Sequence, residues 1–76
     1  MELSLAEFEI LAALLNAGGR VVTRDQLINR LHPHGEGIDS RSIDVYVGRL
    51  RAKLGDSSAR PRFVVTVRGV GYRLAG

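Results

Sequence analysis

Arginine side chains recur along residues 39–54 at a spacing that suits nucleic-acid binding. Taken as an α-helix, this segment presents one side of short residues bordered by guanidinium groups: Arg41, Val45, Gly48, Arg49, Arg51 and Ala52. Guanidinium groups bind phosphates and the major-groove edge of guanine, and an aliphatic side chain such as Val45 can contact a thymine methyl group. The pattern predicts a helix that lies in the major groove of duplex DNA.

The opposite side of the same helix is apolar. Its large residues recur at helical intervals, with an aromatic ring at the edge of the stripe: Ile43, Tyr46, Val47, Leu50 and Leu54. This periodicity predicts a core face. Gly48 lies mid-helix, where glycine costs roughly 1 kcal/mol relative to alanine, which suggests that a partner approaches the backbone there. A merely solvated basic face is the alternative interpretation.

The composition indicates one small domain. The chain has 76 residues, of which 45% are hydrophobic, and it has no cysteine, so neither a disulfide nor a thiolate metal site is expected. It has no run of about 18 apolar residues. The early charges Glu2, Glu7 and Glu9 do not suit a secretory leader. We therefore expect a soluble, cytoplasmic chain.

The charges are segregated along the chain. Residues 1–38 carry three arginines against five acids, whereas residues 39–76 carry eight basic residues against three acids. A basic half of this kind indicates a polyanionic partner, because phosphate neutralisation supplies much of the affinity of DNA-binding proteins. A membrane surface is the rival partner, but the basic residues are interleaved with core positions and have no Trp or Phe face beside them.

The first element that would position this helix is a helix that begins after Ser4. Ser4 and Glu7 have the spacing of a capping box, and Gly18 with Gly19 can end the helix. The main apolar stripe, predicted as its core face, consists of Leu5, Phe8, Leu11, Ala12 and Leu15. Ile10 and Leu14 fall outside that stripe and predict a second neighbour.

A short strand and a second helix follow. Residues 20–22 include two β-branched valines, which predicts a brief strand. Thr23 and Gln26 have the spacing of a second capping box. The core residues of this helix are predicted to be Leu27, Ile28 and Leu31. It must end by His32, because Pro33 disfavours helical geometry in the residue before it.

Residues 32–37 are predicted to form a loop rich in turn residues. Its His32, His34 and Glu36 admit three interpretations: a metal site, a surface that contacts another protein, or a plain connector. Their spacing matches no zinc pattern, so we expect no metal ligand here.

The end of the chain predicts a β-hairpin. Residues 62–67 alternate sides, residues 68–71 form a glycine-containing turn, and residues 72–74 return. The Gly-Val-Gly sequence does not fit a nucleotide-binding loop, because no helix follows and the third glycine is missing. The order helix, strand, helix, helix, hairpin is that of a winged helix-turn-helix. Arg68 would lie at the wing tip, where it could enter the minor groove.

Four segments of the chain resemble the effector domain of OmpR/PhoB-type response regulators. They are residues 3–11, 20–27, 42–54 and 66–73, so the resemblance covers nearly the whole chain. It implies a bacterial transcription factor of a two-component system, in which a receiver domain precedes this domain. It further implies head-to-tail dimers on direct-repeat DNA, monomers off DNA, and no catalysis or cofactor.

The resemblance also implies site residues. The predicted DNA-binding residues are Arg41, Ser42, Val45, Tyr46, Gly48, Arg49, Arg51, Lys53, Thr66 and Arg68. The loop with His32, His34 and Glu36 matches a segment through which some members touch RNA polymerase. Three departures stand out. Gly48 replaces a larger residue of the family, and the receiver domain is expected to be absent from this chain. The family's N-terminal sheet is also expected to be missing, which would leave Ile10 and Leu14 uncovered.

Sequence-specific binding of double-stranded DNA is therefore the predicted function. A protein-interaction module without specific DNA binding is the alternative, with Ile10 and Leu14 as its apolar surface. An enzyme is the third possibility, but the chain has no cysteine, no G-x-S-x-G sequence and no recognisable grouping of acids and histidines.

Overall fold

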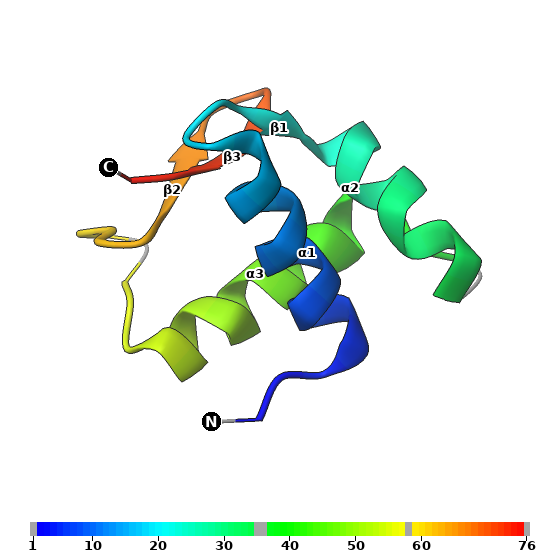
Figure 1. Cartoon of the computed structure of the whole chain (residues 1–76), viewed down its shortest axis with the longest axis horizontal. Helices are drawn as coiled ribbons and strands as arrows, with labels where there is room; N and C mark the ends of the chain where they lie inside the picture. The colour runs from blue at the N-terminus through cyan, green and yellow to red at the C-terminus, as the bar shows by residue number, and fades with distance from the viewer. Residues whose placement is uncertain (1, 35–36, 58, 76) are drawn as a thin grey trace.

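The computed structural model describes residues 2–34, 37–57 and 59–75. Along the chain, the elements are α1 (Leu5–Ala17), β1 (Val22–Thr23), α2 (Arg24–Leu31), the 3-10 helix η1 (His32–His34), α3 (Ser40–Leu54), β2 (Val64–Val67) and β3 (Gly71–Leu74). Three helices, a small antiparallel sheet and a C-terminal hairpin confirm the predicted winged helix-turn-helix. In Figure 1, α1 passes in front of α3, with the sheet at the upper left and α2 at the right.

The capping box of α1 is present as predicted. The backbone N–H of Glu7 donates to the Ser4 hydroxyl at 3.2 Å, and the backbone N–H of Ser4 donates to Glu7 Oε1 at 2.7 Å. At the other end, Gly18 adopts the left-handed conformation with φ 59°, which ends the helix.

Most of the face of α1 that the sequence pattern predicts as core is exposed, although Leu11 packs partly buried against the core. Leu5, Phe8 and Leu15 are 55%, 54% and 60% exposed, whereas Ile10 and Leu14 are fully buried. Helix α1 carries two apolar stripes, and helical periodicity alone does not say which stripe has neighbours. Because α2, α3 and β3 all pack on α1, this chain itself covers Ile10 and Leu14, and the expected lack of cover for them is wrong.

Helix α2 follows β1 directly. Its capping box is confirmed, with the N–H of Gln26 3.1 Å from the Thr23 hydroxyl oxygen and the N–H of Thr23 2.9 Å from Gln26 Oε1. Leu27 and Leu31 are buried and Ile28 packs against the core. The helix ends at Leu31, as expected before Pro33, but the predicted loop begins with η1.

Helix α3 matches its prediction closely. Asp39 caps its N-terminus by accepting the N–H of Ser42 at 2.9 Å, and Gly55 ends it with φ 71°. Ile43, Val47 and Leu50 are fully buried. The two remaining members of the apolar stripe, Tyr46 and Leu54, are partly buried and pack against the same core.

The three strands form one antiparallel sheet in the order β1-β3-β2. Tyr72 in the central strand lies opposite Val22 on one side and Thr66 on the other. The sheet needs glycine at position 71, because a Cβ there would lie 2.0 Å from the carbonyl oxygen of Val22. The wing turn between β2 and β3 includes Gly69, whose φ is 71°.

The observed bounds of two strands differ slightly from the sequence prediction. Strand β1 is observed at Val22–Thr23 and not at residues 20–22, and β2 begins at Val64 and not at Arg62. Strand β2 starts late because the Asp56 carboxylate accepts hydrogen bonds from the backbone N–H groups of Arg62, Phe63 and Val64. These bonds, with that of Val64 the largest contribution, hold the pKa of Asp56 well below its usual range.

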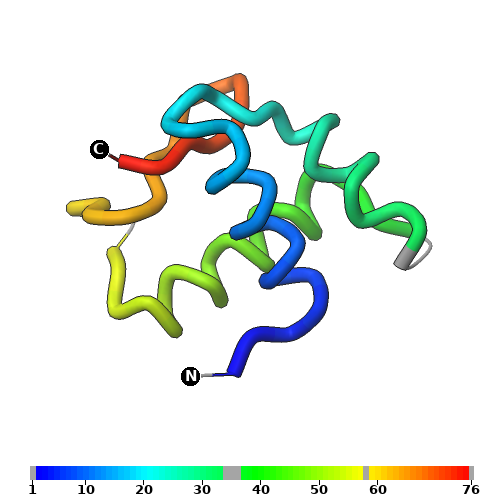
Figure 2. Tube along the Cα trace, in the orientation of Figure 1, coloured from blue at the N-terminus to red at the C-terminus, as the bar shows by residue number. Residues whose placement is uncertain are grey.

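Figure 2 shows the same arrangement as a trace, with α1 in front of α3 and the strands at the upper left. In that view α3 ends at the lower left and β2 lies above that end, and the hydrogen bond from Arg51 to the carbonyl oxygen of Val64 joins the two elements. No helix of the described segments has the length and apolar character that crossing a bilayer requires.

Candidate nucleic-acid interface

A shallow hollow lies on the outward side of α3, opposite its buried stripe. Its borders are formed by Asp39, Arg41, Ser42, Val45, Tyr46 and Arg49. Val45 is about half exposed. Gly48 is also exposed, and beyond the adjacent residues and the backbone of its own helix no atom lies within 4 Å of the place where a Cβ would stand. The structure thus brings together most of the α3 residues predicted to bind DNA, on a surface that is low and bordered by arginines.

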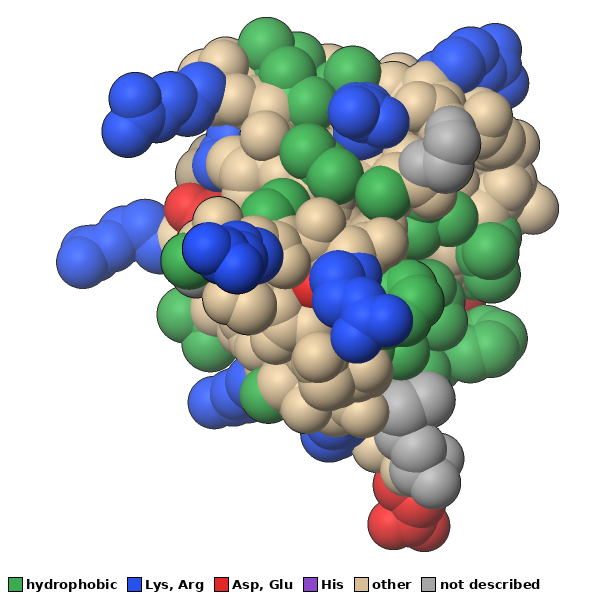
Figure 3. All heavy atoms as spheres, turned by 90° about the vertical axis from the view of Figure 1, so that its left-hand side faces the viewer, with side chains coloured by type: hydrophobic (Ala, Val, Ile, Leu, Met, Phe, Trp, Pro, Cys, Tyr) green, Lys and Arg blue, Asp and Glu red, His purple; other side chains and the backbone are tan. Residues whose placement is uncertain are grey.

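The arginines on this side are not held in ion pairs within the described part of the chain. Within the described ranges, no ion pair joins Arg41, Arg49 or Arg68 to a carboxylate. The neighbouring acid Asp39 accepts bonds from the backbone N–H and the hydroxyl of Ser42, and these bonds, with a smaller contribution from the adjacent Arg41, lower its pKa. Lys and Arg side chains project along the left edge of Figure 3 and across the face toward the viewer, while hydrophobic side chains gather at the right edge.

The wing turn lies beside the beginning of α3. A second hollow is lined by residues from the starts of α2 and α3 and from the wing turn: Thr23, Arg24, Asp25, Ser40, Gly69 and Val70. The backbone N–H of Arg24 also donates to the carbonyl oxygen of Val70 at 3.3 Å. Arg68, exposed on the same turn, is therefore held near the N-terminal end of α3.

A polar joint connects α2, α3 and β3. Asp44 Oδ1 accepts a hydrogen bond from Arg24 Nε at 2.9 Å and another from the Tyr72 hydroxyl at 2.5 Å. Burial alone would raise the pKa of Asp44, but the bonds from Tyr72 and Arg24 outweigh burial and lower it. Burial and the bond to Asp44 raise the pKa of Tyr72. The carboxylate therefore stays ionised and the phenol stays protonated at neutral pH.

Arg51 does not lie on the DNA-facing side where the sequence places it. It is 8% exposed, and its Nε and Nη2 donate to the carbonyl oxygen of Val64 at 3.2 and 2.8 Å. Its Nη2 also donates to Thr66 Oγ1 at 2.7 Å. On a helix, Arg51 follows Val47 by four residues and precedes Leu54 by three, which places it next to the buried stripe. It ties α3 to β2, while Thr66 itself remains exposed.

Lys53 also has a structural partner. Its Nζ lies 2.5 Å from Oε1 of Glu7 on α1, and the Glu7 side chain is 1% exposed. The bonds from Lys53 and from the backbone N–H of Ser4 hold the pKa of Glu7 at about 2. Lys53 therefore balances a buried carboxylate, and its place in the predicted DNA-binding set is not supported by this geometry.

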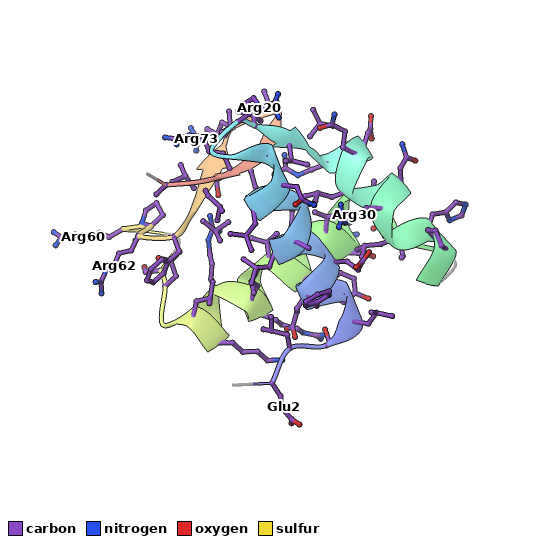
Figure 4. All side chains as sticks on the ribbon, viewed as in Figure 1. Glu2, Arg20, Arg30, Arg60, Arg62 and Arg73 are labelled. Atoms are coloured by element: carbon purple, nitrogen blue, oxygen red, sulfur yellow. The ribbon has the colours of Figure 1, made fainter. Side chains whose placement is uncertain are left out.

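Further arginines lie outside the hollow on α3, and the sequence analysis counted them only in the net charge. Arg60 and Arg62 point outward from the segment before β2, and Arg20 and Arg73 extend near the sheet (Figure 4). The guanidinium carbon of Arg62 lies 5.7 Å from the centre of the Phe63 ring. Isolated arginines in loops and short strands have no periodic spacing, so no sequence signal beyond charge could have identified them.

The predicted polymerase-contact loop is described only in part. His32 is exposed in η1. Glu36 and the side chain of His34 lie outside the described residues, so the role of this loop stays a prediction.

Fold and surface together define a winged helix-turn-helix domain with a basic side formed by α3 and the wing. A family model for the transcriptional regulatory protein C-terminal domain matches residues 1–74, and the chain belongs to this family. The OmpR/PhoB-type resemblance is confirmed by relatives. The sensory transduction protein RegX3 of Mycolicibacterium smegmatis is 46% identical over 74 residues, which are 97% of this chain and 32% of that protein.

Further relatives and solved structures agree. The KDP operon transcriptional regulatory protein KdpE of Escherichia coli is 41% identical over 73 residues, covering 96% of this chain and 32% of KdpE. The chain thus spans about a third of the length of these curated relatives. The Klebsiella pneumoniae RstA DNA-binding domain, solved in complex with the RstA box, has a TM-score of 0.83 and 40% identity, covering 97% of this chain and 73% of that chain. The AdeR DNA-binding domain, in complex with an intercistronic region, has a TM-score of 0.81 and 33% identity, and the match covers 100% of this chain and 74% of that chain.

Proposed function

We propose that this chain binds double-stranded DNA in a sequence-specific manner, as the output domain of a two-component response regulator. Helix α3 enters the major groove and the wing turn reaches the adjacent minor groove. The observation that carries the proposal is the joint placement of Arg41, Val45 and Arg49 on one shallow side of α3, with Arg68 on the turn beside it. Solved DNA complexes of RstA and AdeR, which share this fold, support it.

The proposed contacts divide by chemistry. Arg41 and Arg49 are long enough to contact guanine or phosphate, and Val45 and Gly48 form the low part of the surface on which a thymine methyl group can rest. Ser42 and Tyr46 border the same hollow. Thr66 and Arg68 on the hairpin contact the backbone and the minor groove. Arg51 and Lys53 are left out because both have partners within the fold.

Arg49→Ala tests the recognition role. Losing one bidentate guanine contact costs on the order of 1–3 kcal/mol of discrimination, so affinity for a duplex selected from a random pool should fall about 5- to 150-fold. Affinity for a random duplex should fall far less. Arg20→Ala, which removes an exposed arginine bonded to the carbonyl oxygen of Ala17, is the matched control. Equal losses on both duplexes would remove Arg49 from base recognition.

A salt titration separates this function from a protein-interaction module. The exposed apolar stripe with Leu5, Phe8 and Leu15 supports such a module, whereas Ile10 and Leu14 are buried and cannot form its surface. Phosphate binding releases counterions and gives a steep fall of log K with log salt, while an apolar protein contact gives a shallow one. A shallow slope would favour the module.

The assembly of the regulator is a further part of the proposal. We infer that the domain is a monomer alone and binds direct repeats as a head-to-tail dimer in the bacterial cytoplasm. We also infer that the loop with His32, His34 and Glu36 touches RNA polymerase. Sedimentation with a one-site and a two-site duplex tests the dimer. A two-site duplex that binds its two copies independently would argue against it.

A further inference from the structure

Asp44 is the point at which α2, α3 and the wing strand β3 meet. A single oxygen, Oδ1, accepts one bond from Arg24 at 2.9 Å and another from Tyr72 at 2.5 Å. Along α3, Asp44 precedes Val45 directly and follows Arg41 by three residues. A displacement of Asp44 therefore moves the surface that is proposed to face the major groove.

Tyr72 links this point to the rest of the wing. Its side chain is buried, and its strand pairs with both other strands. The guanidinium carbons of Arg24 and Arg51 lie 5.1 and 5.6 Å from the centre of its ring, distances at which a cation is attracted to an aromatic face. The ring is thus a shared contact for a cation of α2 and a cation of α3.

The wing is tied to α3 at two separate places. The bond from Tyr72 to Asp44 joins β3 to the N-terminal half of α3, and the bonds from Arg51 to Val64 join β2 to its C-terminal half. A single tie would leave α3 free to pivot against the hairpin. Hydrogen bonds at Asp44 and Arg51, seven residues apart along the helix, fix the angle between α3 and the hairpin.

We infer that Asp44, Tyr72 and Arg24 are positioning residues that set the angle between α3 and the wing. This inference rests on the proposed DNA binding. Arg49 and Arg68 come from different elements, and both reach their grooves only if these elements keep one relative orientation. Recognition contacts tolerate displacements of only about 0.5 Å. The hydroxyl of Tyr72 therefore supports recognition without touching the DNA.

The three residues have separable roles because Asp44 is also a charge. Its side chain is 48% exposed next to the proposed DNA-facing side, and an uncompensated carboxylate there would repel phosphates. Arg24 neutralises that charge, whereas Tyr72 contributes a bond and no charge. Loss of the Tyr72 hydroxyl should therefore affect alignment and leave the net charge of the surface unchanged.

The test is a double-mutant cycle with Tyr72→Phe and Arg68→Ala, measured by fluorescence anisotropy. The probes are the duplex selected from a random pool and a random-sequence duplex of equal length. We expect Tyr72→Phe to weaken binding to the selected duplex by about 3- to 10-fold, the scale of one hydrogen bond, and to change random-duplex binding by less than about 2-fold. Arg68→Ala should cost less in the Tyr72→Phe background than in the wild type, because a misaligned wing has already lost part of its contact.

Leu74→Ala is the control for stability. Leu74 lies on the same strand and packs partly against the core, so its loss weakens the fold without removing a bond to Asp44. It should leave the ratio of selected to random affinity unchanged. Asp44→Ala provides the second route to the same bond, at a helix position exposed enough to accept alanine. It should lower the ratio while random-duplex affinity is kept or rises.

Two results would overturn the inference: equal losses on both duplexes for Tyr72→Phe, or effects of Tyr72→Phe and Arg68→Ala that simply multiply. A wild type that binds both duplexes alike would overturn the proposed function together with the inference. A wild-type preference that survives intact in both Tyr72→Phe and Asp44→Ala would refute the positioning role alone.

Discussion

Lys53→Met tests whether Lys53 supports the fold or the DNA contact. The substitution keeps an unbranched side chain of similar length and removes the ammonium group that lies 2.5 Å from Glu7 Oε1. Glu7 is then left as a buried carboxylate whose remaining partner is Ser4, with the backbone N–H of Ser4 at 2.7 Å. Because a buried charge without its counter-charge is destabilising, the free energy of unfolding should fall.

The magnitude follows from the pKa of Glu7. A change from 4.5 to about 2 corresponds to about 3 kcal/mol of preference for the charged form in the folded state. Lys53 supplies only part of this preference, since Ser4 also bonds the carboxylate. The Lys53 side chain is 38% exposed, so water screens the pair. We therefore expect Lys53→Met to lower the free energy of unfolding by about 1–2 kcal/mol at neutral pH.

The stabilisation that comes from Glu7 should depend on pH and be lost in acid. The pKa of Glu7 is lower in the folded state than in the unfolded chain, so its ionisation stabilises the fold above pH 4.5 and stops doing so as the pH falls through about 2. Urea unfolding of wild type and Lys53→Met should differ most at neutral pH. The difference should shrink across that acid range. A difference that stays constant down to the lower limit would refute the assignment of the effect to Glu7.

A DNA-binding arm completes the experiment. Lys53→Met should leave the slope of log K on log salt unchanged, whereas Arg49→Ala should weaken binding without lowering the free energy of unfolding. The reverse pattern, a stable Lys53→Met variant with weakened binding to every duplex, would return Lys53 to the DNA-facing set.

Three further predictions use other positions. Gly71→Ala should destabilise the fold by about 3 kcal/mol or more, because its Cβ would meet the Val22 carbonyl oxygen at 2.0 Å; a thermal melt close to that of wild type would contradict this. Gly48→Ala has open space around it and should stabilise α3 by up to about 1 kcal/mol, yet it should weaken binding to the selected duplex, and unchanged affinity would show that no partner approaches this backbone. Arg68→Ala should weaken binding most when an A·T-rich minor groove flanks the site, and equal losses with G·C-rich flanks would remove the minor-groove role.

The parts of the fold that local chemistry determines could be predicted from the sequence. Both capping boxes join residues three positions apart, and the apolar stripe of α3 repeats every three or four residues, so a single pass along the chain identifies them. The outward side of α3 follows from the same periodicity. Fold class and most of the candidate interface were therefore predictable.

The face that α1 buries could not be predicted in the same way. Both of its stripes have helical spacing, and the choice between Ile10 with Leu14 and Phe8 with Leu15 depends on where α2, α3 and β3 pack. The burial of Glu7 on the same side as Ile10 and Leu14 is visible only in the structure. A capping glutamate that is also buried needs a cation, and the cation is Lys53, which lies 46 residues away in the chain.

The two kinds of cation on α3 also differ only in partners that are distant in the sequence. Arg51 and Lys53 resemble Arg41 and Arg49 in type and lie within a few residues of them, but their acceptors are Val64, 13 residues later, and Glu7, on another helix. Only tertiary structure reveals these partners. The charge pattern therefore identifies the basic helix but does not sort its members.

That sorting explains how a chain of modest net charge presents a basic side. In the described residues, Glu7, Glu9 and Asp44 pair with cations within the fold, and Asp56 accepts backbone N–H groups. These acids cannot also approach the arginines on the outward side of α3 and on the wing. The field there depends on where the carboxylates are held as much as on the number of arginines. Releasing one of them, as Arg24→Gln would do for Asp44, should weaken binding to random duplexes as well as to the selected duplex, whereas the loss expected for Tyr72→Phe falls almost entirely on the selected duplex.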